Sequence, residues 1–308
     1  MTKTKSSLYL SQAEKYWLDG DVKSARLAFS DAKDECLKNG DTRGVADAVT
    51  RLGDMEMSLG RVDEAKEAYV SALSLLLLDF DSQSLSAEIK LKLAQIAVDR
   101  NETEETERLL DQAEALFDET DNRTGLARVA EMRGTLLMAK GDCETALPFY
   151  RKAALLYEQE NNTLKEAVVL RTVSRLYMSL NRMDQAHDAL EKSMALFREN
   201  GDLLGEAGAL TAVGVLRTTI GDYMLAARAF RKAIMLYGKL GHVPGEGEAT
   251  FYLARVEAMS GGAESIKNAV KDYKRSISLL DGVFWPELVA KAKQEMERLE
   301  KVSASSEN

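Results

Sequence analysis

Few side chains in this sequence are of the types that carry out catalysis or bind metals. There are two histidines, His187 and His242, and two cysteines, Cys36 and Cys143. Neither histidine has a Cys or another His at the spacing of metal ligands. A phosphate-binding loop of the G-x-x-x-x-G-K type is also missing from the sequence. We therefore expect no catalytic residue, no metal and no cofactor.

Two arginines do have a spacing that could bind an anion. Arg171 and Arg175 are four residues apart, so in a helix both guanidinium groups can point the same way. Arginine grips carboxylates through paired hydrogen bonds, so the two could bind a carboxylate or an acidic segment. The alternatives are that both are solvated, or that they pair with acidic groups across neighbouring segments.

The elements that would position these arginines repeat along the chain. One turn residue recurs every 40 or 41 positions and is always Gly or Asn, which tolerate the left-handed conformation at a helix end. This column consists of Gly20, Gly60, Asn101, Gly141, Asn181 and Gly221. A second turn column follows twenty residues later, at Gly40, Phe80, Asp121, Asn161, Gly201 and Gly241. Each unit is therefore two helices of roughly 17 residues, about 26 Å long.

Small and large residues also recur at fixed distances from these turns. A small residue precedes each turn of the first column by seven positions, and a large residue follows it by nine. The small residues are Ala13, Gly53, Ala94, Gly134, Ser174 and Gly214, and the large ones are Phe29, Tyr69, Leu110, Tyr150, Leu190 and Phe230. Small residues let helix axes approach to about 8–10 Å. Because neither helix can bury its apolar stripe alone, the units must stack.

These columns resemble the tetratricopeptide repeat family. Two repeats carry its pattern of small residue, glycine turn, alanine, aromatic and alanine: Gly134, Gly141, Ala146, Tyr150 and Ala153, then Gly214, Gly221, Ala226, Phe230 and Ala233. The longer period of about 40 residues is similar to the long-helix variant of the family. The resemblance implies an all-α solenoid, a right-handed superhelix of about seven helical hairpins plus a C-terminal capping helix.

We expect one continuous domain over residues 1–302. Its repeats fall at about 6–40, 41–80, 81–121, 122–161, 162–201, 202–241 and 242–281. A capping helix is expected at 285–301, with Pro286 in the favoured first turn. Residues 303–308 are expected to form a disordered tail.

The resemblance further implies that the first helix of each unit lines a concave groove. Its groove positions should lie ten and six residues before the turn. The peptide-binding candidates are Arg171, Arg175, Thr211, Val215, Phe251, Tyr252, Arg255, Glu131 and Asp54. The N-terminal half of the groove carries Glu14, Asp47, Asp54 and Glu88, whereas the C-terminal half carries the arginines. No expected groove position is Lys or Asn, which disfavours the carboxylate clamp of chaperone-binding members.

Bulk properties exclude several classes of function. The net charge of −9 disfavours binding to nucleic acid. No apolar run, such as Leu75 to Leu78, is long enough to span a membrane, and no secretory signal is recognisable. With only two cysteines, a reducing, cytoplasmic location is expected.

The sequence thus predicts a non-enzymatic adaptor or scaffold that binds a peptide segment or a partner helix in its groove. The partner is expected to be a protein or peptide, with an acidic or C-terminal carboxylate segment as the sharpest hypothesis. A ligand- or peptide-responsive sensor acting through a separate partner is an alternative, and a self-assembling scaffold is another. A monomer is expected if the end helices cap the array.

Overall fold

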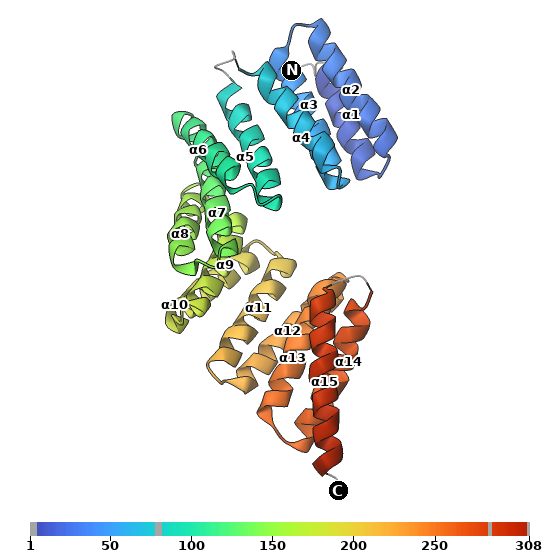
Figure 1. The fold of residues 1–308 in the computed structure, drawn as a ribbon, viewed down its shortest axis with the longest axis vertical. Helices are drawn as coiled ribbons and strands as arrows, with labels where there is room; N and C mark the ends of the chain where they lie inside the picture. The colour runs from blue at the N-terminus through green and yellow to red at the C-terminus, as the bar shows by residue number, and fades with distance from the viewer. Residues whose placement is uncertain (1–4, 78–81, 283–284, 307–308) are drawn as a thin grey trace. The chain divides into compact units, whose positions relative to one another are not determined.

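The computed structural model describes residues 5–77, 82–282 and 285–306 and forms fifteen α-helices, with no strand in these ranges (Figure 1). The predicted all-α solenoid class is confirmed. The helices are α1 Lys5–Leu18, α2 Val22–Lys38, α3 Thr42–Ser58, α4 Val62–Leu75, α5 Gln83–Asp99, α6 Thr103–Glu119, α7 Arg123–Ala139, α8 Cys143–Gln159, α9 Thr163–Ser179, α10 Met183–Glu199, α11 Leu203–Thr219, α12 Tyr223–Leu240, α13 Val243–Ser260, α14 Ala263–Leu280 and α15 Pro286–Ser306.

Both predicted turn columns are confirmed by the backbone. Every described member has a positive φ: Gly20, Gly60, Asn101, Gly141, Asn181 and Gly221 in the first column, and Gly40, Asp121, Asn161, Gly201 and Gly241 in the second. Phe80 lies outside the described residues. Because glycine pays no Cβ penalty at positive φ and asparagine pays little, these positions end one helix and redirect the chain.

The residue that follows each turn often caps the start of the next helix. The side chain of Asp202 accepts a hydrogen bond from the Gly205 N–H at 2.9 Å, and Asp41 accepts one from Gly44 at 2.8 Å. Such caps satisfy amide groups that have no partner inside the helix. The same cap recurs at Asp21, Asp142, Asn162, Asp222 and His242.

Helix pairs are held together by close contacts between glycines and aromatic rings. A Cβ added at Gly214 of α11 would lie 2.5 Å from a ring carbon of Phe230 in α12. Gly53 stands in the same relation to Tyr69, at 2.6 Å. The small and large columns predicted from the sequence are therefore in direct contact, and the helix axes approach closely because these positions lack a side chain.

The helices group into two compact units, Met1–Leu136 and Leu137–Asn308, with the boundary near the end of α7. Within the first unit α3 packs against α4, and α5 against α6. Within the second unit α9 packs against α10, α11 against α12, and α13 against α14. A single continuous domain over residues 1–302 stays a prediction.

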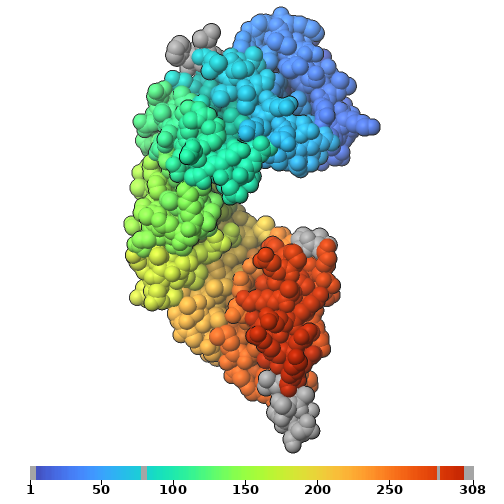
Figure 2. Space-filling model, in the orientation of Figure 1, coloured from blue at the N-terminus to red at the C-terminus, as the bar shows by residue number. Residues whose placement is uncertain are grey.

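The last helix, α15, packs on α14 and α13 at the C-terminal end of the second unit, where its surface is visible in Figure 2. Val289 and Ala292 are buried on its inner side. Helix α15 runs to Ser306, so residues 303–306 are helical rather than part of a disordered tail. The sequence after Lys301 contains no Gly or Pro that would end the helix. Residues 307–308 lie outside the described ranges.

Candidate functional site

Three first helices form one face of the second unit. Helix α11 contacts both α9 and α13, so it lies between them. We call the surface formed by these three helices the groove face. It presents Arg171 and Arg175 from α9, Gly208 and Val215 from α11, and Glu248 from α13.

Two candidates do not belong to this surface. Phe251 is 1% exposed and packs against Tyr273, with ring centroids 5.8 Å apart. Thr211 is 8% exposed, and its hydroxyl donates a hydrogen bond to the Ala207 carbonyl oxygen at 3.0 Å. For these two residues, the expectation that the position ten residues before the turn points into the groove is wrong. That column is also buried at Thr50 and Leu91, because it packs against neighbouring helices.

Arg171 occupies this buried column, yet its charged end reaches the groove face. A Cβ at Gly208 would lie 2.1 Å from Arg171 Nη1, so the guanidinium rests against the bare backbone of α11. The guanidinium carbon also lies 5.8 Å from the centroid of the Phe197 ring. Burial lowers the pKa of Arg171, although an arginine remains charged at neutral pH. The guanidinium is thus partly buried between the Phe197 ring and the backbone of α11.

Arg175 is exposed one helical turn further along α9. Glu248 faces both arginines from α13 and is half-buried. Burial raises the pKa of Glu248, while Arg175 and then Arg171 lower it by electrostatic attraction. Among the described residues, no carboxylate lies within 4.0 Å of either guanidinium, and no cation lies that close to Glu248. The two arginines therefore carry positive charge that no ion pair neutralises.

The remaining candidates in the second unit have partners or are partly covered. Arg255 lies over the Phe251 ring at 5.9 Å and is 3.6 Å from the Glu295 carboxylate of α15. Tyr252 is half-buried and stacks on Phe230, with ring centroids 5.7 Å apart. Val215 is half-buried. Arg255 is thus held by the C-terminal helix, which the sequence did not indicate.

The acidic positions in the first unit are neutralised across repeats. Asp54 is 2.7 Å from Lys92 Nζ and accepts a hydrogen bond from the Tyr69 hydroxyl at 2.7 Å. The other two pairs are Glu14 with Arg51, which also binds Asp47, and Glu88 with Arg128. We call the pairs Glu14–Arg51, Asp54–Lys92 and Glu88–Arg128 the ion-pair ladder.

The expected acidic stretch of groove is therefore not a free negative surface, because cations from adjacent first helices cover it. Glu131 is half-buried in the same unit. The partners in the ladder are 37, 38 and 40 residues apart. Opposite charges one repeat apart were a signal in the sequence that could have revealed these pairs.

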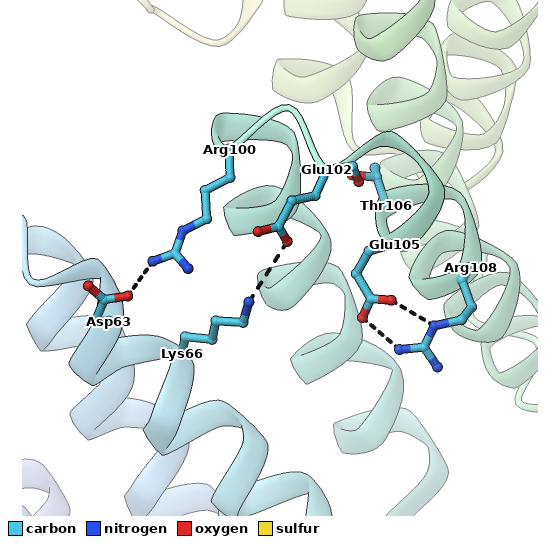
Figure 3. Close-up of polar contacts among 7 residues, drawn as sticks. All are labelled: Asp63, Lys66, Arg100, Glu102, Glu105, Thr106 and Arg108. Atoms are coloured by element: carbon cyan, nitrogen blue, oxygen red, sulfur yellow. Dashed lines mark hydrogen bonds and ion pairs between the residues drawn. The ribbon is translucent and has the colours of Figure 1, made fainter.

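A second set of charges lies where first and second helices meet (Figure 3). Arg100 pairs with Asp63, Lys66 lies 3.8 Å from Glu102, and Arg108 lies 2.6 Å from Glu105. In the second unit, Arg182 at the start of α10 pairs with Glu144 of α8 at 2.7 Å, which again joins neighbouring repeats. The Arg100–Asp63 and Lys66–Glu102 pairs join neighbouring repeats, whereas Arg108 and Glu105 pair within α6. All of these charges have partners, so they do not indicate a site.

The described residues form neither a metal-binding cluster nor a membrane-spanning helix. In the parts of the chain that the structure describes, no group of three or more His, Cys, Asp and Glu could hold a metal ion. None of the helices in those ranges is long and apolar enough to cross a membrane.

Comparison with protein families agrees with the periodic structure. Family models described as tetratricopeptide repeat match residues 46–75 and 125–199. The chain contains tetratricopeptide repeats. No curated protein sequence matches the chain. With the repeat bounds expected from the sequence, the groove face consists of the first helices of the fifth, sixth and seventh repeats.

Solved structures share the tetratricopeptide repeat fold at low identity. A Pyrococcus horikoshii signal transduction ATPase with a tetratricopeptide repeat sensor is 14% identical, with a TM-score of 0.75 over 97% of this chain. The match covers 44% of that ATPase, so this chain spans less than half of its length. The apo form of RapI is 14% identical, with a TM-score of 0.74 over 98% of this chain and 86% of RapI. A tetratricopeptide repeat protein from Parabacteroides merdae is 15% identical, with a TM-score of 0.60 over 96% of this chain and 98% of that one.

Proposed function

We propose that this chain is a non-enzymatic protein-interaction module whose groove face binds an acidic segment of a partner through Arg171 and Arg175. Tetratricopeptide repeats generally form protein-interaction scaffolds, and this supports the coarser part of the proposal. The finer part rests on one observation. Among the described residues, the ladder charges and Arg255 all have ion-pair partners, whereas Arg171 and Arg175 have none.

The energetics of Arg171 favour a ligand over a purely structural role. Its guanidinium is partly removed from water, and no carboxylate compensates for the lost hydration within the described residues. A carboxylate bound there would regain hydrogen bonds to charged groups, each contributing about 1.5–3 kcal/mol. Because the guanidinium rests on Gly208 and over Phe197, little side-chain entropy remains to be lost on binding.

The proposal is tested by capturing a partner on the purified chain and titrating a fluorescent peptide from its bound segment. Arg171→Glu/Arg175→Glu should weaken binding at least a hundredfold, since about 3 kcal/mol from two contacts corresponds to that factor. Arg228→Glu/Lys232→Glu is the matched control. It makes the same charge change at the same spacing on exposed positions of α12, and it should leave the affinity within about twofold.

Binding to the wild type should weaken from low to moderate salt, because exposed ion pairs are screened over about 8–10 Å. Circular dichroism must show that both double variants are folded. If the folded Arg171→Glu/Arg175→Glu variant keeps every partner with unchanged affinity, the groove-face proposal is wrong. Binding would then have to be sought on the second helices or at the ends.

A ligand-responsive sensor acting through a separate partner is the second candidate. Its support is the likeness of nearly the whole chain to a structure whose name includes a tetratricopeptide repeat sensor. In that case the captured peptide should alter hydrogen exchange in helices that it does not touch. Either version places the chain in the cytoplasm, in keeping with the free thiols of Cys36 and Cys143.

A further inference from the structure

The groove face contains a carboxylate, Glu248, that like Arg171 and Arg175 has no ion-pair partner among the described residues. In the ladder, Glu88 of α5 pairs with Arg128 of α7, and these residues occupy equivalent positions one repeat apart. The same 40-residue step relates Glu248 of α13 to Gly208 of α11. Arg128 lies one repeat after Glu88, whereas Gly208 lies one repeat before Glu248 and has no side chain to offer. After Glu248, Lys291 of α15 lines the same pocket, but among the described residues no cation lies within 4.0 Å of the Glu248 carboxylate.

Arg171 fills part of the space that Gly208 leaves, but it does not close the pair. Its guanidinium attracts Glu248 electrostatically without lying within ion-pair distance of the carboxylate. The local charges are therefore two cations on α9 and one anion on α13, separated by the small residues of α11. A ligand that lies across α11 meets both signs of charge.

Glu248 also lines a pocket of about 470 Å³ at the start of α15. The other lining residues are Trp285, Pro286, Glu287, Leu288 and Lys291. Trp285 is 45% exposed, which leaves part of an indole ring available to a ligand. A carboxylate beside an aromatic face suits an ammonium or guanidinium group, because ion pairing and cation–π attraction act together. Glu248 and Glu287 outnumber the single cation of the lining, Lys291.

We infer that the partner segment carries a lysine or arginine a few residues from its acidic group, and that this basic side chain binds at Glu248 in the α15 pocket. The inference rests on the proposed function, because it describes the ligand of the same face. A purely acidic segment would be repelled by Glu248, whereas a segment with both charges completes both open ion pairs. Glu248 thus sets specificity, and the arginines supply much of the affinity.

The test uses a displayed library of random decapeptides with free carboxyl termini, selected on the immobilised full chain. Wild type should enrich peptides that combine an acidic side chain or a terminal carboxylate with Lys or Arg at a fixed spacing. An enriched peptide should then bind Glu248→Gln at least tenfold more weakly. Glu199→Gln, an exposed position on α10, is the matched control and should bind as wild type does.

The same peptide with its basic residue replaced by glutamine should bind wild type and Glu248→Gln equally. That result assigns the basic side chain to Glu248 rather than to a change in folding. If Arg171→Ala/Arg175→Ala abolishes binding but no basic residue is enriched, or if Glu248→Gln has no effect, this inference is wrong and the proposed function stands. If wild type enriches no peptide, or if Arg171→Ala/Arg175→Ala binds the enriched peptide as tightly as wild type does, the proposed function is wrong. This inference is then wrong as well, because it depends on that function.

Discussion

Replacing Gly214 by alanine tests the close helix packing on which the groove face depends. The new Cβ would lie 2.5, 2.6 and 2.7 Å from three ring carbons of Phe230, roughly 1 Å inside ordinary contact. Phe230 is 0% exposed and its ring stacks on Tyr252, so it has little room to move. Overpacking of this kind costs about 1–3 kcal/mol.

Alanine also favours a helix over glycine, by about 0.8–1.0 kcal/mol, and this gain must be separated from the clash. Gly238→Ala provides the separation. Gly238 is exposed in α12, and an added Cβ there would have nothing closer than Glu246 Oε2 at 3.6 Å. Because both variants gain the same helix propensity, the difference between their free energies of unfolding isolates the clash. We expect Gly214→Ala to be less stable than Gly238→Ala by about 1–3 kcal/mol.

The assay is urea unfolding followed by circular dichroism, with hydrogen exchange of α11 and α12 amides as a local readout, since repeat arrays can unfold in parts. Gly238→Ala should raise the unfolding midpoint above that of wild type. Exchange in α11 and α12 should accelerate in Gly214→Ala. Equal stabilisation by the two substitutions would refute the argued contact between small and large columns.

Three further predictions concern charge and assembly. Burial, and then the nearby Asp272, raise the pKa of Glu257 above 4.5, despite its bond to Arg231. Glu257 therefore stabilises the fold below about pH 4.5, and this contribution is lost as pH rises through its folded pKa. In urea titrations from pH 4.5 to 8, the free energy of unfolding should fall for wild type, and Glu257→Gln should remove the part of that decrease due to Glu257. Lys92→Met breaks one rung of the ladder and should cost under about 1 kcal/mol, with a smaller effect in 1 M salt; a larger cost in high salt would contradict an ion-pair origin. Light scattering at micromolar concentration should give the monomer mass of 34.0 kDa, and a concentration-independent dimer would favour a self-assembling scaffold.

The positions of turns and the packing columns could be predicted from the sequence because each rests on one residue's local chemistry. Gly141 or Asn181 ends a helix wherever it stands, and Gly214 permits close approach wherever an aromatic residue faces it. Because the same signals recur in every repeat, together they determine where each helix begins and ends. The C-terminal end lacks that support, and the helix there extends beyond the expected boundary at residue 301.

The composition of the groove face could be predicted only in part. Which stripe of a first helix faces a neighbour depends on how helices cross, and a difference of one position buries Phe251 and Thr211. Arg171 is half-buried in that stripe, and its long stem places the guanidinium against α11 because Gly208 leaves space for it there. Neither a rotamer nor a gap on another helix is visible in a one-dimensional pattern, so the role of Gly208 could not be predicted.

The ion-pair ladder distinguishes repeats that the packing columns make interchangeable. Any repeat with a small residue and an aromatic residue in register could take any place in the array. The ladder opposes such exchange, though weakly, because each rung suits a particular neighbour: deleting the third repeat would put Met132 where Lys92 now meets Asp54, at a cost of under about 1 kcal/mol. The charges therefore record the order of the repeats. Gain or loss of an internal repeat would therefore keep the packing columns matched while separating the charged partners that now meet.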